Sequence, residues 1–295
     1  TFDDHLAEDI FLLNGKEQSE KEVAKISRFL DLFCEYIGER PFARVESINF
    51  VPTAAGLASS ASAFAALSLA VADALKLDMT RQELSTFARR GSGSSTRSLF
   101  GGFVEWEMGT SSEDSMAHPV DDADWDVGML VLVVDSQEKK IASRIGMEHT
   151  VQTSPFYPAW IESAREDLQA MKAAIAEKDF ETLGRITEHN GFKMHATTLS
   201  ANPPFTYWSA DSLLAQEAVR QVREELQVPA YMTMDAGPNV KVLCRASDMG
   251  RLQKALSAHF PVEKIISSLP GPAAYVLSEA DWQQSKTRLT EGNHL

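Results

Sequence analysis

The hydrophobic pattern of the chain changes repeatedly between the helical period and the short apolar runs of strands. Between Ser19 and Gly38, apolar side chains recur every three or four positions, which predicts an amphipathic helix that ends at Gly38. Val127–Val134 is almost continuously apolar and β-branched, a pattern typical of a strand covered on both faces. The chain is therefore expected to contain both amphipathic helices and buried strands.

Further elements follow from the same patterns and from turn and capping signals. Ser19–Glu22 and Thr80–Glu83 carry the capping-box pattern, and Asn14-Gly15 is a strong tight-turn signal. Gly109–Asp126 is acidic and polar, which predicts a solvated loop. The other predicted strands are Asp9–Leu13, Phe42–Phe50, Phe103–Met108, Ala230–Met234 and Val240–Cys244. The other predicted helices are Ala61–Leu77, Thr80–Arg90, Pro158–Glu177, one capped by Asp179, and one from Ser209 or Asp211 to Glu225.

For two of these helices, the sequence also predicts the role or the burial of individual side chains. The helix that follows Asp179 carries His195, and a lone histidine on a helix is more often a structural residue than a catalytic one. The helix before it is expected to bury one face, formed by Trp160, Ile161, Ala164, Leu168, Met171 and Ile175.

Composition narrows the class of protein. The chain has 295 residues, of which 44% are hydrophobic and 24% charged, as expected for a soluble globular protein of one large domain or two. Its net charge of −14 argues against a nucleic-acid partner. Cys34 and Cys244 are too few for a disulfide framework, which suits a reducing cytosol. No apolar run approaches the roughly 20 residues that a membrane span needs, and nothing at the start resembles a signal peptide.

Three short blocks carry candidate chemistry. In the first, a small-residue loop from Pro52 to Ser60 opens an Ala-rich helix. The first backbone N–H groups of a helix have no partner within it, and together with the helix dipole they form an anion site. The loop is not a Walker A motif, because no Gly-Lys-Ser/Thr follows. These residues alone are equally compatible with a simple turn before a buried helix.

The second and third blocks are ambiguous when each is taken alone. Gly91–Ser98 sets one arginine, Arg97, among hydroxyl groups; it fits a flexible turn but also a bidentate anion site. Met232–Val240 reads Met-Thr-Met-Asp-Ala-Gly-Pro-Asn-Val, so that a strand ends in Asp235 on a Gly-Pro turn. Such a turn composition is common by itself.

Together the three blocks resemble a known family. The first, PTAAGLASSASAFAAL, resembles the phosphate loop of the GHMP kinase superfamily, and all three match the diphosphomevalonate decarboxylases in the same order. The resemblance extends from Thr1 to about Ala274. It implies an α+β, two-domain GHMP kinase fold: a ribosomal-protein-S5-like N-terminal domain over 1–138 and a ferredoxin-like C-terminal domain over 139–295.

The resemblance also implies roles for individual residues. Asp235 falls on the catalytic aspartate, Ser92 and Ser94 would donate to the substrate diphosphate, and Arg97 would orient its carboxylate. Lys139 or Lys140 would face phosphate, and Ser143 would bind substrate, although Ala142 replaces the first serine of the family's Ser-Ser-x-x-Gly-Met segment. The residues expected to hold the ATP phosphates are Ala55, Gly56, Leu57, Ala58, Ser59, Ser60 and, on the preceding strand, Ser47.

The implied reaction is ATP-dependent decarboxylation of mevalonate 5-diphosphate to isopentenyl diphosphate, with release of ADP, phosphate and carbon dioxide. Mg²⁺ would be carried by the ATP phosphates, and no side chain is predicted as a direct metal ligand. The implied protein is a cytoplasmic homodimer with no membrane partner. The alternatives are a GHMP kinase that only phosphorylates, a non-catalytic ligand-binding relative, and a nucleic-acid binder, which the net charge disfavours.

One family feature is missing from the sequence. Family members begin with a segment containing Asn-Ile-Ala-x-x-Lys-Tyr-Trp-Gly-Lys, which lines the substrate pocket, and this chain begins at Thr1 without it. Either the protein has a few tens of further residues or it is an inactive truncation. The first is expected, because the three downstream blocks are intact.

Overall fold

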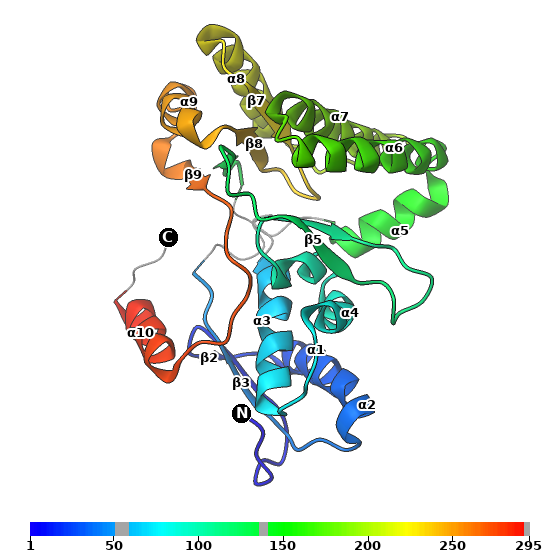
Figure 1. Cartoon of the computed structure of the whole chain (residues 1–295), viewed down its shortest axis with the longest axis vertical. Coiled ribbons are helices and arrows are strands. Elements are labelled where there is room, and N and C mark those ends of the chain that lie inside the picture. Colours follow the sequence, from blue (N-terminus) through cyan, green and yellow to red (C-terminus); the bar gives the residue numbers. More distant parts are fainter. Residues whose placement is uncertain (51–58, 136–140, 292–295) are drawn as a thin grey trace. The chain divides into compact units, whose positions relative to one another are not determined.

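The computed structural model describes residues 1–50, 59–135 and 141–291 (Figure 1). The described residues fall into two compact units. The first comprises those up to Pro119 together with those from Pro272 onwards, and the second runs from Val120 to Gly271. No helix in the described part of the chain is long and apolar enough to cross a membrane.

This division differs from the predicted boundary at residue 138. Strand β6 (Gly128–Leu132) precedes that position, yet it pairs with β8 (Val240–Cys244) and β9 (Ile265–Ser268) in one sheet. Backbone pairing of β6 therefore assigns it to the second unit. The change of composition after residue 134 marks the end of a strand rather than the end of a unit.

The first unit combines a small sheet with packed helices. Its sheet has the order β2-β1-β3, with β1 parallel to β3 and antiparallel to β2. The strands are β1 (Ile10–Leu13), β2 (Lys16–Glu17), β3 (Arg44–Ser47) and a separate pair, β4 (Phe103–Trp106) and β5 (Ala117–Asp121), whose last two residues already belong to the second unit. The helices are α1 (Glu20–Leu30), α2 (Cys34–Ile37), α3 (Ser59–Ala74), α4 (Arg81–Gly91) and α10 (Glu279–Thr290), with 3₁₀ turns at Asp31–Phe33 and Gly93–Leu99.

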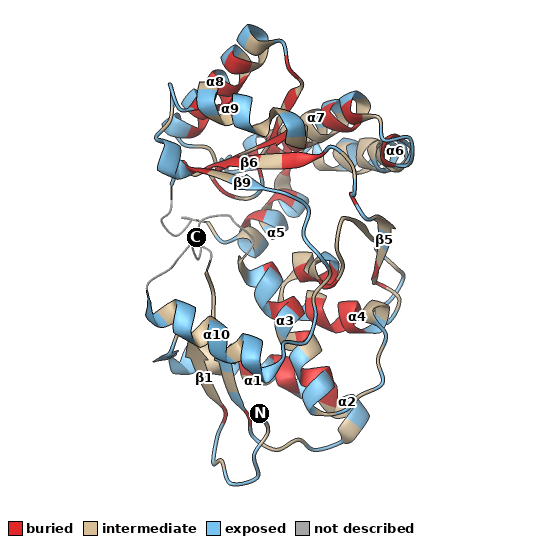
Figure 2. Cartoon of the chain, turned by 60° about the vertical axis from the view of Figure 1, so that its left-hand side comes forward, coloured by how far each residue is buried: buried red, intermediate tan, exposed pale blue. Residues whose placement is uncertain are grey.

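The Ala-rich helix α3 is central to the core of this unit. Its buried residues are Ala61, Phe64, Ala65, Ser68, Val71 and Ala72, which follow the helical period. Small side chains on this face allow close approach, while Phe64 packs against Phe29 at a ring distance of 5.0 Å. Figure 2 shows buried segments along α3 and α4, whereas α10 has no buried residue. The predicted packable helix is confirmed.

The second unit is a four-stranded antiparallel sheet with helices. The strand order is β7-β8-β6-β9, where β7 is Ala230–Thr233. Its core includes Leu130, Leu132, Met232, Val240 and Val242 from the sheet. The helices are α5 (Ser143–Thr153), α6 (Tyr157–Ala176), α7 (Phe180–Leu199), α8 (Ala210–Leu226) and α9 (Met249–Leu256), with 3₁₀ turns at Ala246–Asp248 and Val262–Lys264. Helices α6 and α7 lie side by side (Figure 1).

Several sequence predictions require correction. Ser19 precedes α1 but its side chain forms no capping hydrogen bond, whereas the capping box at Thr80 is confirmed. The predicted loop Gly109–Asp126 contains strand β5. On α6, Ile175 is buried but Leu168 is exposed, so the predicted inner face is only partly covered. The other members of that face, Trp160, Ile161, Ala164 and Met171, are half-buried.

A glycine fixes the approach of α7 to β7. A Cβ atom added at Gly184 would lie 1.9 Å from Cδ2 of Tyr231, and the Tyr231 hydroxyl donates to Glu181 at 2.6 Å. The ring therefore cannot move without loss of that bond. We expect Gly184→Ala to lower the free energy of unfolding by roughly 1–3 kcal/mol, measured by chemical denaturation.

A matched control for this variant lies in α9. A Cβ atom added at Gly250 would meet no other atom within 4 Å. Because alanine favours helix more than glycine does, Gly250→Ala should leave stability unchanged or raise it by up to about 1 kcal/mol. Equal effects of the two substitutions would show that the contact with Tyr231 does not limit packing.

Candidate active site

The N-terminus of α3 is the described end of the first block. Ala55, Gly56, Leu57 and Ala58 lie outside the described residues, so their predicted role stays a prediction. Ser59 begins the helix, and the Oγ atom of Ser60 lies 3.2 Å from that of Ser92. This hydrogen bond brings the helix that follows the predicted phosphate loop into contact with the second block. The first N–H groups of a helix have no partner within it, which makes the N-terminus of a helix a suitable place for a phosphate.

The second block forms a 3₁₀ helix rather than a flexible turn. Ser95 and Thr96 are buried, and their hydroxyls donate to the backbone oxygens of Ala88 (2.6 Å) and Gly93 (2.6 Å). Ser95 also donates to the backbone oxygen of Ser92. These bonds fix the segment from its inner side.

The same 3₁₀ geometry places two predicted site residues on one edge. With three residues per turn, side chains at positions i and i+3 are aligned, so Ser94 and Arg97 share an edge of the segment Gly93–Leu99. Arg97 is exposed, and no described residue forms a hydrogen bond with the Ser94 hydroxyl. This edge therefore carries a hydroxyl and a guanidinium, and Ser92 is the N-cap residue of the same segment. A guanidinium with neighbouring donors is suited to carboxylate or phosphate.

Asp235 follows the last residues of β7 in the second unit. The β7–β8 hairpin brackets it, and the backbone N–H of Gly237 donates to its carbonyl oxygen at 2.7 Å. Its carboxyl group is 70% exposed, as a group that receives a ligand must be. The predicted strand, turn and following strand are confirmed, with β8 covering the predicted Val240–Cys244.

Buried polar groups hold the backbone around this turn. The Ser212 hydroxyl of α8 donates to the carbonyl oxygen of Pro238 at 2.7 Å. Asn239 is buried, and its Oδ1 accepts from the backbone N–H of Val134 at 2.8 Å. The turn is thus attached to α8 and to the chain after β6, which makes its backbone position well defined.

His195 supports the same turn from α7. It is fully buried, and its Nε2 lies 3.2 Å from the carbonyl oxygen of Met234, next to Asp235. Trp208 packs on the imidazole at a ring distance of 4.8 Å. These contacts support the structural interpretation of His195, because the ring meets backbone and aromatic side chains.

The burial of His195 predicts a pH dependence of stability. Burial lowers the pKa of this imidazole below its usual value, against smaller raising effects of the Met234 carbonyl and Asp235. Below pH 6.5 the unfolded chain therefore binds a proton that the folded chain does not, and stability falls as the pH decreases towards the folded pKa. We expect His195→Gln to flatten the loss of unfolding free energy between about pH 7 and pH 5.5, measured by denaturation. An unchanged slope would contradict this origin.

Sequence reasoning did not find Lys241. Its Nζ lies 2.9 Å from Oδ2 of Asp235, and its side chain is only 13% exposed. Lys241 is the cross-strand partner of Thr233, two positions before Asp235. The register of the hairpin places Lys241 close to Asp235, but the sequence did not single it out, because a lysine on a predicted strand is ordinarily a surface residue.

Of the remaining predicted site residues, the structure describes only Ser143 and Ser47. Ser143 is the first residue of α5 and is half-buried, behind an N-cap residue, Ala142, that forms no side-chain capping bond. Lys139 and Lys140 lie outside the described residues. Ser47 is the last residue of β3, as predicted, and no hydrogen bond joins its side chain to a described residue. The described residues contain no group of three His, Cys, Asp or Glu side chains that could bind a metal.

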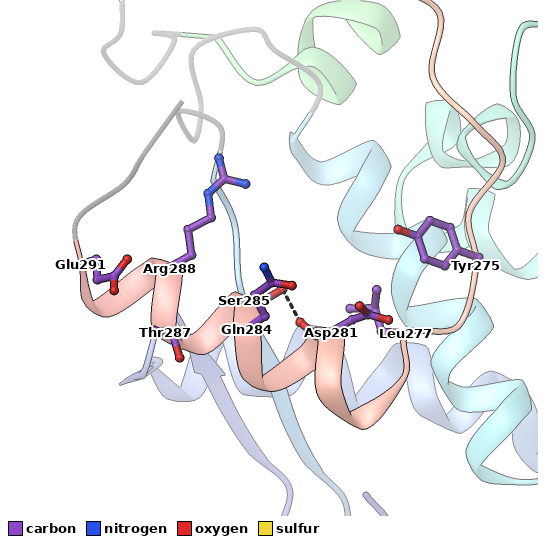
Figure 3. Close-up of a pocket in the computed structure, with 8 residues that line it drawn as sticks. All are labelled: Tyr275, Leu277, Asp281, Gln284, Ser285, Thr287, Arg288 and Glu291. Carbon is purple, nitrogen blue, oxygen red and sulfur yellow. Dashed lines mark hydrogen bonds between the residues drawn. The ribbon is translucent and has the colours of Figure 1, made fainter.

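A hollow in the first unit does not coincide with the predicted residues. It has a volume of about 540 Å³ and lies along α10 (Figure 3). Figure 3 shows Gln284 and Arg288 on the helix and Tyr275 on the segment before it. The remaining lining residues are Leu277, Asp281, Ser285, Thr287 and Glu291. None of these residues belongs to the three blocks.

The site residues lie within two domains known from other proteins. The N-terminal domain of diphosphomevalonate decarboxylase-like proteins matches residues 1–117, and the C-terminal domain of mevalonate 5-diphosphate decarboxylases matches residues 129–291. This chain belongs to the diphosphomevalonate decarboxylase family. The two matches together include all three blocks that carry the site.

Individual members of the diphosphomevalonate decarboxylase family agree with this. Diphosphomevalonate decarboxylase of Candida albicans is 39% identical over 221 residues, 73% of this chain and 61% of that protein. The chain thus spans less than two thirds of that relative. Phosphomevalonate decarboxylase of Haloferax volcanii is 30% identical over 274 residues, 93% of this chain and 83% of that protein.

Solved structures of decarboxylases in this family have the same fold. Mevalonate diphosphate decarboxylase from Staphylococcus aureus has a TM-score of 0.90 at 44% identity, covering 94% of this chain and 84% of that one. A complex of the decarboxylase abbreviated MDDEF with MVAPP, AMPPCP and magnesium has a TM-score of 0.86 at 48% identity, covering 92% and 84%. The predicted α+β, two-domain GHMP kinase fold is confirmed.

Proposed function

We propose that this protein catalyses ATP-dependent decarboxylation of mevalonate 5-diphosphate to isopentenyl diphosphate, with release of ADP, phosphate and carbon dioxide. Membership of the diphosphomevalonate decarboxylase family supports the reaction class. The structural observation that carries the proposal is the edge of the 3₁₀ segment. There Ser94 and Arg97 share one edge, and Ser92, the N-cap residue of the segment, meets Ser60 at the start of α3.

This arrangement suits a substrate with two anionic ends. Phosphate oxygens would accept hydrogen bonds from the serine hydroxyls and from the first N–H groups of α3. The guanidinium of Arg97 would hold the carboxylate in a fixed orientation, since its N–H groups form a planar fork. Phosphoryl transfer alone does not require the carboxylate to be aligned with a leaving phosphate, whereas decarboxylation does.

Asp235 would act on the tertiary hydroxyl of the substrate. A hydroxyl is a poor leaving group, so ATP first phosphorylates it, and phosphate then leaves as the neighbouring carboxylate is lost as carbon dioxide. Phosphoryl transfer proceeds through a loose transition state, in which positioning and charge neutralisation matter more than a strong base. A carboxylate can therefore orient the hydroxyl and accept its proton late. Mg²⁺ bound together with ATP would neutralise the charge of the phosphates.

The complex of MDDEF with MVAPP, AMPPCP and magnesium supports ATP and Mg²⁺ as the expected cosubstrate and ion. The part of the chain that the structure describes fits this assignment, because the N-terminus of α3 is suited to phosphate and no separate metal cluster is required. The nucleotide would be bound through its phosphates at that helix.

The test is product analysis with the purified protein. Given Mg-ATP and mevalonate 5-diphosphate, it should release carbon dioxide, inorganic phosphate and ADP in equal amounts. Accumulation of ADP with a stable phosphorylated product and no carbon dioxide would identify a kinase instead. No ATP consumption with intact binding would identify a non-catalytic relative.

The similarity to the Haloferax volcanii phosphomevalonate decarboxylase calls for a second substrate in the same assay. Mevalonate 5-phosphate has one phosphoryl group fewer. If Ser92 and Ser94 both donate to a diphosphate, the diphosphate should be turned over with the higher kcat/KM. A preference for the monophosphate would reassign the substrate while leaving the reaction class unchanged.

We also propose that the protein is a homodimer in the cytoplasm. The low cysteine content supports a reducing compartment, and neither Cys34 nor Cys244 forms a disulfide. Light scattering of the purified protein tests the dimer, and cell fractionation tests the location.

A further inference from the structure

The contacts that fix the backbone at Asp235 do not fix the orientation of its carboxylate. His195 and Ser212 fix the chain on either side of the turn. Neither of them touches the side chain of Asp235, and a side chain that is 70% exposed would otherwise sample several rotamers. Orientation of the carboxylate therefore requires a further contact.

Lys241 supplies that contact. Its Nζ lies 2.9 Å from Oδ2 of Asp235, while Oδ1 forms no hydrogen bond with a residue that the structure describes. One oxygen is thus held and the other is left open to a ligand. The stem of Lys241 rises from β8, whose backbone is fixed by pairing with β7 and β6, so the ammonium group starts from a rigid position.

The exposure of the two partners is unequal, and this argues against a role in stability. The side chain of Lys241 is 13% exposed, whereas that of Asp235 is 70% exposed, so the carboxylate remains in water. An ion pair with one exposed partner contributes little to folding, because solvent screens it. The pair is therefore better explained by the orientation that it gives the carboxylate than by a contribution to folding.

An ordinary structural ion pair in the same unit is different. Lys193 of α7 and Asp167 of α6 are each 20% exposed and 2.6 Å apart, and Asn190 also donates to Asp167. There both partners are shielded, and the carboxylate is bound by two donors. The pair joins two helices, and it provides a matched control for the pair at the turn.

We propose that Lys241 is a positioning residue for Asp235: it holds Oδ2 so that Oδ1 points at the hydroxyl that is phosphorylated. This inference rests on the proposed function, since it assigns Asp235 the role of proton acceptor. Lys241 stabilises the orientation of the carboxylate and its negative charge until the phosphoryl group has moved. The γ-phosphoryl group of ATP passes to the oxygen of the substrate hydroxyl as ADP leaves, and the proton of that hydroxyl passes to Oδ1.

The first experiment compares variants of Lys241 in ADP formation. Lys241→Met should lower kcat by roughly tenfold to thirtyfold, because small misplacements of a reacting group are costly. The KM values for ATP and the mevalonate substrate should stay within about twofold, since Lys241 acts after binding. Lys241→Arg should restore most of the rate, and Lys241→Gln provides a second uncharged variant. The control Lys193→Met should remain close to the parent protein.

A double mutant decides whether Lys241 acts through Asp235. If it does, adding Lys241→Met to Asp235→Asn should cause no further loss of ADP formation. If the two losses multiply, Lys241 acts on the substrate directly and the proposal is wrong. A normal kcat for both Lys241→Met and Lys241→Gln would also overturn it.

Separate measurement of ADP and carbon dioxide distinguishes a failure of this proposal from a failure of the proposed function. ADP formation reports phosphoryl transfer, whereas carbon dioxide reports decarboxylation. A parent protein that forms ADP but no carbon dioxide contradicts the decarboxylase assignment and still tests Lys241. A parent protein that forms neither refutes the reaction on which both depend.

Discussion

Asp235→Asn is expected to lower kcat by about a thousandfold or more while leaving the binding of ATP and of substrate nearly unchanged. The substitution keeps the size of the side chain but removes the only carboxylate proposed to accept the proton of the substrate hydroxyl. Loss of a general base typically costs about 10²–10⁴ in rate, and Asp235 is also the group proposed to orient that hydroxyl. The measurement is steady-state ADP release, with nucleotide affinity determined separately by titration.

A control for Asp235→Asn lies on the surface of the same unit. Asp124 is 77% exposed and lies 3.3 Å from Lys178, so it also has a lysine partner. Asp124→Asn should retain full activity, because it belongs to none of the three blocks. Turnover near that of the parent by a folded Asp235→Asn protein would remove Asp235 from the mechanism.

Arg97→Lys is expected to lower turnover by about a hundredfold. Lysine keeps the charge, but it cannot hold a carboxylate through two parallel hydrogen bonds. Loss of one charge-assisted pair costs roughly 2–5 kcal/mol, and about 2.7 kcal/mol corresponds to a hundredfold in rate. ATP binding should persist, because Arg97 is proposed to contact the carboxylate rather than the nucleotide. Carbon dioxide release and ATP affinity are the two quantities to measure.

The matched change for Arg97→Lys is Arg44→Lys in the first unit. Arg44 is 45% exposed and pairs with Glu46 at 2.8 Å, away from the three blocks. It should leave turnover unchanged. If Arg97→Lys instead weakened ATP binding and left the rate of bound substrate intact, Arg97 would belong to the nucleotide site.

The elements with strong local signals were predictable from the sequence. Thr80 and Glu83 specify the start of α4 by a reciprocal capping box, and both of its bonds form. Asp179 caps α7 by accepting from the N–H of Thr182. In each case the information lies within a few residues, so no tertiary contact is needed to read it.

Two of the failures, those at β5 and at Leu168, depend on distant residues. Strand β5 reads as loop because it contains Pro119 and has little alternation; pairing with β4 creates it. Ser19 has the capping sequence, yet its hydroxyl does not bond in the folded chain. Leu168 fits the periodicity of a buried face, but it remains 39% exposed. The local sequence pattern limits the structure and burial that a residue can have, and contacts with distant residues determine which of them it adopts.

The candidate site divides in the same way. Asp235 and Arg97 were predicted as site residues because the three blocks together resemble those of a known family, and the edge shared by Ser94 and Arg97 then follows from the 3₁₀ period. Lys241 was not predicted because no motif among its neighbours in the sequence distinguishes it from an ordinary strand residue. Only the hairpin register, which pairs it with Thr233, places its ammonium group at the carboxylate.

The return of residues from Pro272 onwards to the first unit has a consequence for synthesis on the ribosome. The second unit is complete once Gly271 has emerged, whereas Lys286 of α10, which pairs with Glu46 at 3.1 Å, is made later still. At about 5–20 residues per second, roughly 8–30 s separate the emergence of Pro119 from that of Pro272. During this interval the nascent first unit lacks its last helix and Ala274, which packs against its core. The second unit can thus complete its folding before the first, and the first unit is the one expected to bind chaperones during synthesis.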